Sequence, residues 1–346
     1  MTHKTPEFEA LNELSARVGA DPAWVQAAGG NTSIKEDGIL WIKASGLWLM
    51  HARQQEIMVP VALDALLGAL ERADPLAEQA QHFVVEELNP SGLRPSIETT
   101  VHALMPQKVV VHVHCVETIA LAVAEDAERL IHERLSGFRH AFIPYIRPGL
   151  PLARAIAASL GEDTDVVVLG NHGLVVAADT VAAAELLLER VTAALVTRPR
   201  LAPPADLVAL EHLALNSNYQ LPEDPALQGL GTDPASCWIA SAGSLYPDQV
   251  IFLSDAIAFG RAGETARDLE QTSRLLLIFP CKGVLVARHA SAGALAMIRG
   301  LADVASRISP ATDLRVLTDA ECAELLGWDA EKYRQSLNSG KRNETP

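Results

Sequence analysis

Apolar positions recur with two different periods along the first two hundred residues. From Glu7 to Val18, and again from about Thr180 to Val196, they return every three or four positions, which predicts amphipathic helices. Shorter runs rich in β-branched residues predict strands; these are residues 38–43, 109–114, 166–169 and 174–176. Apolar spacing also predicts helices at 61–72, 76–88 and 97–105, whereas the small residues at 27–33 indicate a turn. Since strands and helices interleave, we expect an α/β fold with helices on both faces of a sheet.

The pattern partly recurs beyond a proline-containing linker at 198–204. The run 275–287, which includes Gly283, is similar to 166–177, which includes Gly173, so this part of the pattern repeats after 110 positions (173 to 283). Residues 246–253 echo 105–112 after a different interval, and in this alignment Lys282 replaces His172 and Leu253 replaces His112. One hypothesis is a degenerate second copy without metal ligands; the alternative is that two strand–turn–helix units look alike without a common origin.

Composition narrows the possible partners and the compartment. The 346 residues carry 43 Asp and Glu against 28 Lys and Arg, a formal charge of −15, so a nucleic-acid partner is not expected. The N-terminus lacks an apolar signal region, and the apolar run 109–124 is interrupted by polar residues, so no membrane span is expected. The four cysteines are far apart and form no CxxC pair, which indicates a reducing compartment, and we expect a cytoplasmic protein.

Two histidines in the valine-rich strand are the first candidates for chemistry. His112 and His114 project from the same face of a strand, because side chains alternate, and together they can bind one ion. Burying two imidazoles without a partner would cost free energy. His172 lies in an Asn-His-Gly turn at a strand end and supplies a third ligand, the number that catalytic zinc sites take from the protein. Glu98 stands at the start of the helix expected before the histidine strand.

With these residues in place, the chain resembles the class II aldolase/adducin family, of the fuculose-phosphate aldolase and ribulose-phosphate 4-epimerase type. The resemblance covers about residues 10–197. The matching positions occur in the family's order: Gly30-Asn31, Ser45-Gly46, Pro95-Ser96-Ile97-Glu98, His102, His112-Val113-His114, Pro144-Tyr145, Gly149 and Asn171-His172-Gly173-Leu174.

The resemblance implies a role for each matching residue. His112, His114 and His172 would hold a divalent metal, usually Zn²⁺, with Mn²⁺, Co²⁺ and Fe²⁺ as alternatives. Glu98 would be a ligand or general base that swings away when substrate chelates the ion, and Tyr145 a proton donor reaching a neighbouring subunit's site in a homo-oligomer. The substrate's phosphate would be held by a cradle of Gly30, Asn31, Ser45, Gly46 and Ser96.

Three positions qualify this picture. Ile97 stands where aldolases of the family commonly have a second serine, which removes one phosphate donor. Lys43 precedes Ser45-Gly46 in place of a commoner threonine and could compensate with its charge. His102 follows Glu98 by four residues, hence on the same helix face, where it orients Glu98 or packs instead of binding metal.

The resemblance implies retro-aldol cleavage of a ketose, sugar phosphate or sugar-acid derivative through a metal-bound enediolate. Epimerisation, decarboxylation and dehydration use the same chemistry and stay open, as does a non-catalytic adducin-like scaffold. The expected organisation is a metal-dependent catalytic domain at 1–200, an α/β domain without metal ligands at 201–340 and a flexible tail at 341–346. The expected catalytic fold is a three-layer αβα unit with a central, largely antiparallel sheet.

Overall fold

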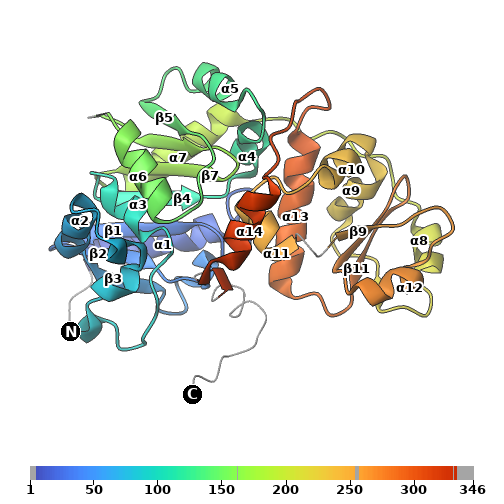
Figure 1. The fold of residues 1–346 in the computed structure, drawn as a ribbon, viewed down its shortest axis with the longest axis horizontal. Coiled ribbons are helices and arrows are strands. Elements are labelled where there is room, and N and C mark those ends of the chain that lie inside the picture. Colours follow the sequence, from blue (N-terminus) through green and yellow to red (C-terminus); the bar gives the residue numbers. More distant parts are fainter. Residues whose placement is uncertain (1–4, 162, 254–256, 330, 333–346) are drawn as a thin grey trace. The chain divides into compact units, whose positions relative to one another are not determined.

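The computed structural model describes residues 5–161, 163–253, 257–329 and 331–332. The chain separates into two compact units, shown in Figure 1 with colours that follow the sequence. One comprises residues 1–122 and 126–196, and the other residues 123–125 and 197–346. The domain limits expected from the sequence, 1–200 and 201–340, stay a prediction, and the expected tail lies outside the described residues. No helix among the described residues is both long and apolar enough to cross a membrane.

The described part of the first unit contains a seven-stranded sheet in the order β3-β2-β1-β4-β7-β6-β5. Its strands are β1 (Asn31–Glu36), β2 (Ile39–Lys43), β3 (Met58–Ala62), β4 (Val109–Val113), β5 (His140–Ile143), β6 (Val166–Leu169) and β7 (Gly173–Ala178). All neighbouring strands are antiparallel except β5 and β6, which are parallel. The predicted α/β class with a largely antiparallel sheet is therefore confirmed.

Helices cover both faces of this sheet. On one face lie α1 (Pro6–Ala20), α4 (Val116–Ala122), α5 (Ala127–Arg134) and α7 (Val181–Leu195); on the other lie α2 (Leu63–Glu71), α3 (Thr99–Leu104) and α6 (Leu150–Ser159). Val109, Val111 and Val113 of β4 pack on the α1 and α7 side, and Val110 packs on the α3 and α6 side. By the same alternation, His112 and His114 project toward α3 and α6.

Two predictions for this unit are wrong in detail. The helix expected at 76–88 is a series of short 3₁₀ turns: η2 (Pro75–Glu78), η3 (Ala80–Phe83) and η4 (Glu86–Leu88), which follow an earlier turn, η1 (Leu49–His51). The reason is that Val84 bridges to Val61 and the Val85 N–H donates to Pro60 O, so the exposed edge of β3 holds these residues extended. The turn expected at 27–33 ends early, because Asn31 already pairs with β4.

The second unit has a smaller sheet in the order β8-β11-β10-β9. Its strands are β8 (Tyr219–Gln220), β9 (Ile257–Phe259), β10 (Leu276–Phe279) and β11 (Gly283–Ala287). Its helices are α8 (Leu207–Leu213), α9 (Gly229–Thr232), α10 (Pro234–Ser241), α11 (Pro247–Leu253), α12 (Ala266–Leu269), α13 (Ala292–Arg307) and α14 (Asp319–Gly327), with 3₁₀ turns η5 (Pro225–Gln228) and η6 (Glu270–Thr272).

This small sheet repeats the topology of half of the large one. The order β8-β11-β10-β9 matches β4-β7-β6-β5, with the same antiparallel, antiparallel and parallel pairings. Phe279 pairs with Gly283 as Leu169 pairs with Gly173, at the expected spacing of 110. A long helix follows in each unit, α7 after β7 and α13 after β11. The shared strand order supports the second-copy hypothesis.

The counterpart of the histidine strand differs from the expected one. Residues 246–253 contain helix α11 instead of a strand, with Pro247 at its first position and Asp248 in its first turn, both of which favour a helix start. The strand that pairs with β11 as β4 pairs with β7 is β8. The alignment of Leu253 with His112 is therefore wrong.

Candidate active site

The candidate site lies where β4, α3 and the β6–β7 turn meet. His112 pairs with Asn31 of β1 on one side and with Val175 of β7 on the other, so both neighbouring strands fix its position. The turn that carries His172 is made by Asn171, whose φ of +53° is one that asparagine tolerates. Gly173 follows, and a Cβ there would lie 2.4 Å from Val113 O. A glycine is therefore needed for the turn to approach β4 this closely.

Four buried side chains converge at this point, as the sequence predicts: Glu98, His112, His114 and His172. Each offers one ligand atom, and these atoms lie within 4.8 Å of one another. His114 Nε2 is 3.2 Å from His112 Nε2. The Glu98 carboxylate is 3.3 Å from His112 Nε2 and 3.4 Å from His172 Nε2. Donors bound at about 2.1 Å around one tetrahedral ion would be separated by roughly 3.4 Å, so these distances fit a divalent ion.

The hydrogen bond at the far side of His112 agrees with metal binding. His112 Nδ1 lies 3.0 Å from Leu174 O, and because a carbonyl only accepts, Nδ1 carries the hydrogen. Nε2 of a neutral ring then presents its lone pair to the cluster, and a backbone carbonyl behind a metal-binding histidine is a common way to orient it. The donor set of three imidazoles and one carboxylate is therefore suited to Zn²⁺ or a similar ion.

Glu98 is held as a carboxylate at the N-terminal end of α3. Burial acts to raise its pKa, but the charges of His112, His172 and His114 and a hydrogen bond from Asn31 outweigh it and lower the pKa to about 2. Nδ2 of Asn31 donates to Glu98 Oε2 at 2.8 Å and to Ser96 Oγ at 3.1 Å. A carboxylate in this position can serve as a metal ligand or as a general base.

His102 lies behind Asn31 and is fully buried. Its Nδ1 is 2.7 Å from Ser33 Oγ, and its Nε2 contacts Asn31 Oδ1. Burial lowers the pKa of His102 to about 3, so the ring is neutral. Ser33 was not among the predicted residues; its signal in the sequence is the Asn-x-Ser spacing, which places Asn31 and Ser33 on one strand face.

The residues predicted to hold a phosphate lie at the same end of the sheet. Gly30 has a φ of +61°, and a Cβ there would lie 2.8 Å from His112 O. The Ser45 N–H donates to Arg94 O, and the Ser96 N–H donates to Lys43 O, which draws the segment around Ser96 against the end of β2. Gly46 follows with a φ of +76°. Their role as an anion cradle stays a prediction.

The structure also shows where Lys43 and Tyr145 lie. Lys43 is buried, and its Nζ donates to Ala28 O at 2.9 Å. It projects from β2 on the side opposite Ile42, which belongs to the core beneath α2, and therefore away from the face that carries His112. Tyr145 follows β5, and its backbone passes Gly170, where a Cβ would lie 3.0 Å from Tyr145 N. Its role at a neighbouring subunit's site stays a prediction.

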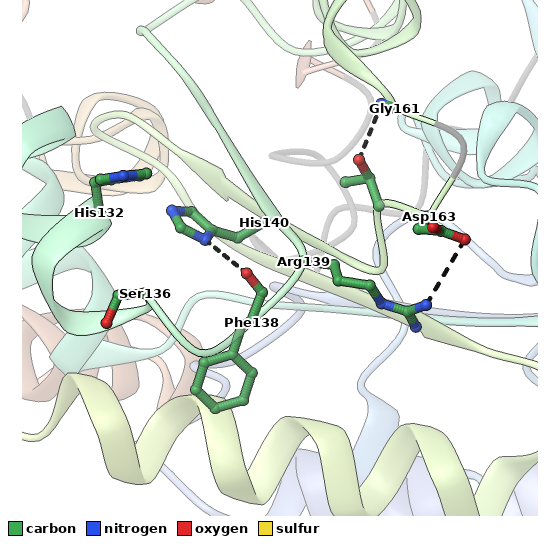
Figure 2. A pocket seen from close by; sticks show the side chains of 8 residues that line it. His132, Ser136, Phe138, Arg139, His140, Gly161 and Asp163 are labelled. Carbon is green, nitrogen blue, oxygen red and sulfur yellow. Dashed lines mark hydrogen bonds and ion pairs between the residues drawn. The ribbon is translucent and has the colours of Figure 1, made fainter.

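A separate cavity of about 450 Å³ lies at the opposite end of β5 (Figure 2). His132 and His140 face each other there with ring centroids 5.1 Å apart, and Figure 2 shows Arg139 turned toward Asp163. His140 pairs with Val166 at the start of β6, whereas His172 follows the end of β6. This cavity therefore does not contain the four-residue cluster.

Comparison with known families identifies the family of the first unit. The family model described as "Class II Aldolase and Adducin N-terminal domain" matches residues 10–196. The chain belongs to this family, which confirms the resemblance found in the sequence.

Two curated proteins are similar to parts of the chain. The uncharacterized oxidoreductase YuxG of Bacillus subtilis is 29% identical over 50% of this chain, and methylthioribulose-1-phosphate dehydratase of Cronobacter sakazakii is 31% identical over 39%. The matched segments span 26% and 56% of those proteins.

Similar solved structures include the N-terminal class II aldolase domain of a conserved protein from Thermoplasma acidophilum. It is 26% identical, with a TM-score of 0.48, over 56% of this chain and 94% of that one. The l-fuculose-1-phosphate aldolase from Thermus thermophilus is 18% identical, with a TM-score of 0.36, over 56% and 93%.

Proposed function

We propose that the first unit is a divalent-metal-dependent lyase that cleaves a carbon–carbon bond in a small ketose, sugar phosphate or sugar-acid derivative by a retro-aldol reaction. The observation that carries this proposal is the buried cluster of Glu98 with His112, His114 and His172. A structural core gains nothing from three imidazoles and a carboxylate brought this close, and their burial without an ion would cost free energy. The same argument disfavours a non-catalytic scaffold.

The three histidines would hold the ion, for which Zn²⁺ suits the donor set best. When bound, the ion supplies a Lewis acid that stabilises the enediolate left by carbon–carbon cleavage. Glu98 would transfer the proton at the substrate carbon where the bond is cleaved: as a carboxylate it accepts a proton from that carbon, and after taking up a proton from water it delivers one. Tyr145 of an adjacent subunit protonates or deprotonates the second oxygen, which requires a homo-oligomer with sites near its interfaces. Gly30, Asn31, Ser45, Gly46 and Ser96 hold the far end of the substrate.

Dehydration, epimerisation and decarboxylation are second candidates, because each begins with the loss of a proton or of a carbon substituent from the same carbon of the substrate. The similarity to a methylthioribulose-1-phosphate dehydratase favours dehydration among them. Ile97 is half-buried between Ser96 and Glu98 and offers no hydroxyl, so a phosphorylated substrate would rely on fewer donors.

Proton exchange tests the proposal without knowledge of the natural substrate. Protein loaded with Zn²⁺ or Co²⁺ is incubated in D₂O with dihydroxyacetone, dihydroxyacetone phosphate or glycolaldehyde, and loss of the α C–H signal is followed by NMR. We expect metal-dependent exchange with at least one of these three compounds and none after chelation. A turnover screen over sugar phosphates, free ketoses and sugar acids then separates cleavage from dehydration and epimerisation. Exchange or turnover that persists in metal-stripped protein, or neither activity in loaded protein, would contradict the proposal.

A further inference from the structure

The buried hydrogen bonds behind the cluster run in one line from β1 to Glu98. Ser33 Oγ contacts His102 Nδ1 at 2.7 Å, His102 Nε2 contacts Asn31 Oδ1, and Asn31 Nδ2 donates to Glu98 Oε2 at 2.8 Å. All four residues are at most 5% exposed. Bulk water therefore cannot reach these side chains to replace a missing hydrogen-bond partner.

The hydrogen positions along this line follow from the groups themselves. An ionised carboxylate only accepts, so the Asn31 group that faces Glu98 must be the amide NH₂. The amide oxygen then faces His102, and because it too only accepts, His102 Nε2 must carry a hydrogen. His102 Nδ1 is left to interact with the Ser33 hydroxyl, which can rotate to suit it.

This arrangement leaves the Asn31 carboxamide one orientation. The last side-chain torsion of asparagine has two broad, roughly equivalent wells, so nothing in the residue itself prevents a flip. A flipped amide would point its oxygen at the Glu98 carboxylate and its NH₂ at the N–H of His102, and both contacts would be repulsive. The Glu98 carboxylate selects this orientation, and the N–H of His102 reinforces it by donating to the amide oxygen.

We propose that His102 is a positioning residue that acts through Asn31. Its Nε2–H holds the amide oxygen of Asn31, which keeps the amide NH₂ directed at Glu98 and so sets the direction of Glu98 beside the three histidines. The same NH₂ also reaches Ser96 Oγ at 3.1 Å. The glutamate and the predicted substrate cradle are therefore oriented by one group. The proposal rests on the proposed function for its chemical meaning, but the orientation of Glu98 can be measured independently.

The test compares His102→Leu, which removes the donor, with His102→Gln, whose amide can still donate to Asn31. His82→Leu is the matched control, because His82 is an exposed histidine outside the site. Each protein is loaded with Co²⁺, and the visible absorption spectrum reports the coordination of the ion. We expect His102→Leu to bind one equivalent, to acquire a spectrum different from wild type, and to exchange ketone protons at least tenfold more slowly with little change in KM. His102→Gln and the control should stay within threefold of wild type.

A double variant tests whether the effect passes through Asn31. In an Asn31→Ala background the further change His102→Leu should leave the spectrum and the exchange rate unaltered, since residues that act as one unit are not additive. A wild-type spectrum and rate in His102→Leu, or additive effects in the double variant, would overturn the proposal. If His102→Leu does not fold, His102→Gln and Asn31→Ala carry the comparison. Wild-type protein that binds Co²⁺ but shows neither exchange nor turnover would refute the proposed function, whereas the spectra would still decide the role of His102.

Discussion

In the proposed mechanism Glu98 acts as a base and the three histidines bind the metal, and single substitutions should separate these two roles. His112→Ala removes a ligand anchored between two strands, so metal and exchange activity should be lost together. Glu98→Gln keeps the shape and leaves three imidazoles, so metal content should stay near one equivalent while exchange falls about 10²–10⁴-fold, the range for loss of a general base. Elemental analysis and the NMR exchange assay measure the two effects. Equal loss of metal in both variants would show that Glu98 is chiefly a structural ligand.

Lys35 provides a pH-dependent feature apart from the cluster. Its Nζ donates to Met105 O and Gln107 O at the end of α3, and burial lowers its pKa from 10.5 to about 8. Between these two values the unfolded chain holds the proton that the folded chain has released, so the stability of the fold should rise with pH in this window. Urea unfolding at intervals from pH 8 to 10.5 should show this rise in wild type and a smaller one in Lys35→Met. Equal slopes in wild type and Lys35→Met would mean that the hydrogen bonds to the two carbonyls cancel the effect of burial on the pKa of Lys35.

At the scale of elements, the two β-hairpins offer a matched pair of glycines. A Cβ at Gly173 would lie 2.4 Å from Val113 O, and a Cβ at Gly283 would lie 2.2 Å from Gln228 Oε1. We expect Gly173→Ala to displace β7 from the histidine strand, to destabilise the fold by about 1–3 kcal/mol, as overpacking does, and to weaken metal binding roughly 10–100-fold.

Gly283→Ala should destabilise the chain without weakening metal binding, because all four residues of the buried cluster belong to the first unit. Gly137→Ala is the neutral control, since nothing lies within 4 Å of the added Cβ. Thermal unfolding and competition with a chromogenic chelator measure stability and affinity. Metal affinity that falls equally in both hairpin variants would argue against a local effect.

The same elements show which features the sequence can predict. The valine-rich strands and the helices α1 and α7 were predictable because in each of them the apolar residues recur with the period of a strand or of a helix. The buried cluster was predictable because His112 and His114 have strand spacing. The extended residues at 84–85 depend on pairing with β3, a contact distant in sequence, and so local periodicity favoured a helix there. The link through Ser33 and His102 likewise appears only once β1 and α3 are placed side by side.

At the scale of the whole molecule, the repeated strand order suggests that the two units have different roles. At the position of the Asn171-His172-Gly173 turn, the second unit has Cys281-Lys282-Gly283, with Cys281 at a φ of +63° where Asn171 has +53°. The backbone of the turn is therefore kept while its imidazole is absent. Among the described residues, the four-residue cluster of the first unit is the group suited to a metal ion. The second unit would then serve an architectural role.

A fragment ending at residue 200 tests this division directly. The apolar clusters beneath both faces of the seven-stranded sheet are built from residues of the first unit alone, so the fragment should fold without the rest of the chain. We expect it to bind one equivalent of Zn²⁺ with an affinity within about tenfold of the full chain, since no ligand is removed. Circular dichroism, chelator competition and light scattering measure folding, affinity and assembly. Full metal binding with exchange activity lost would show that the second unit completes the catalytic assembly, whereas an unfolded fragment would show that the two units fold only together.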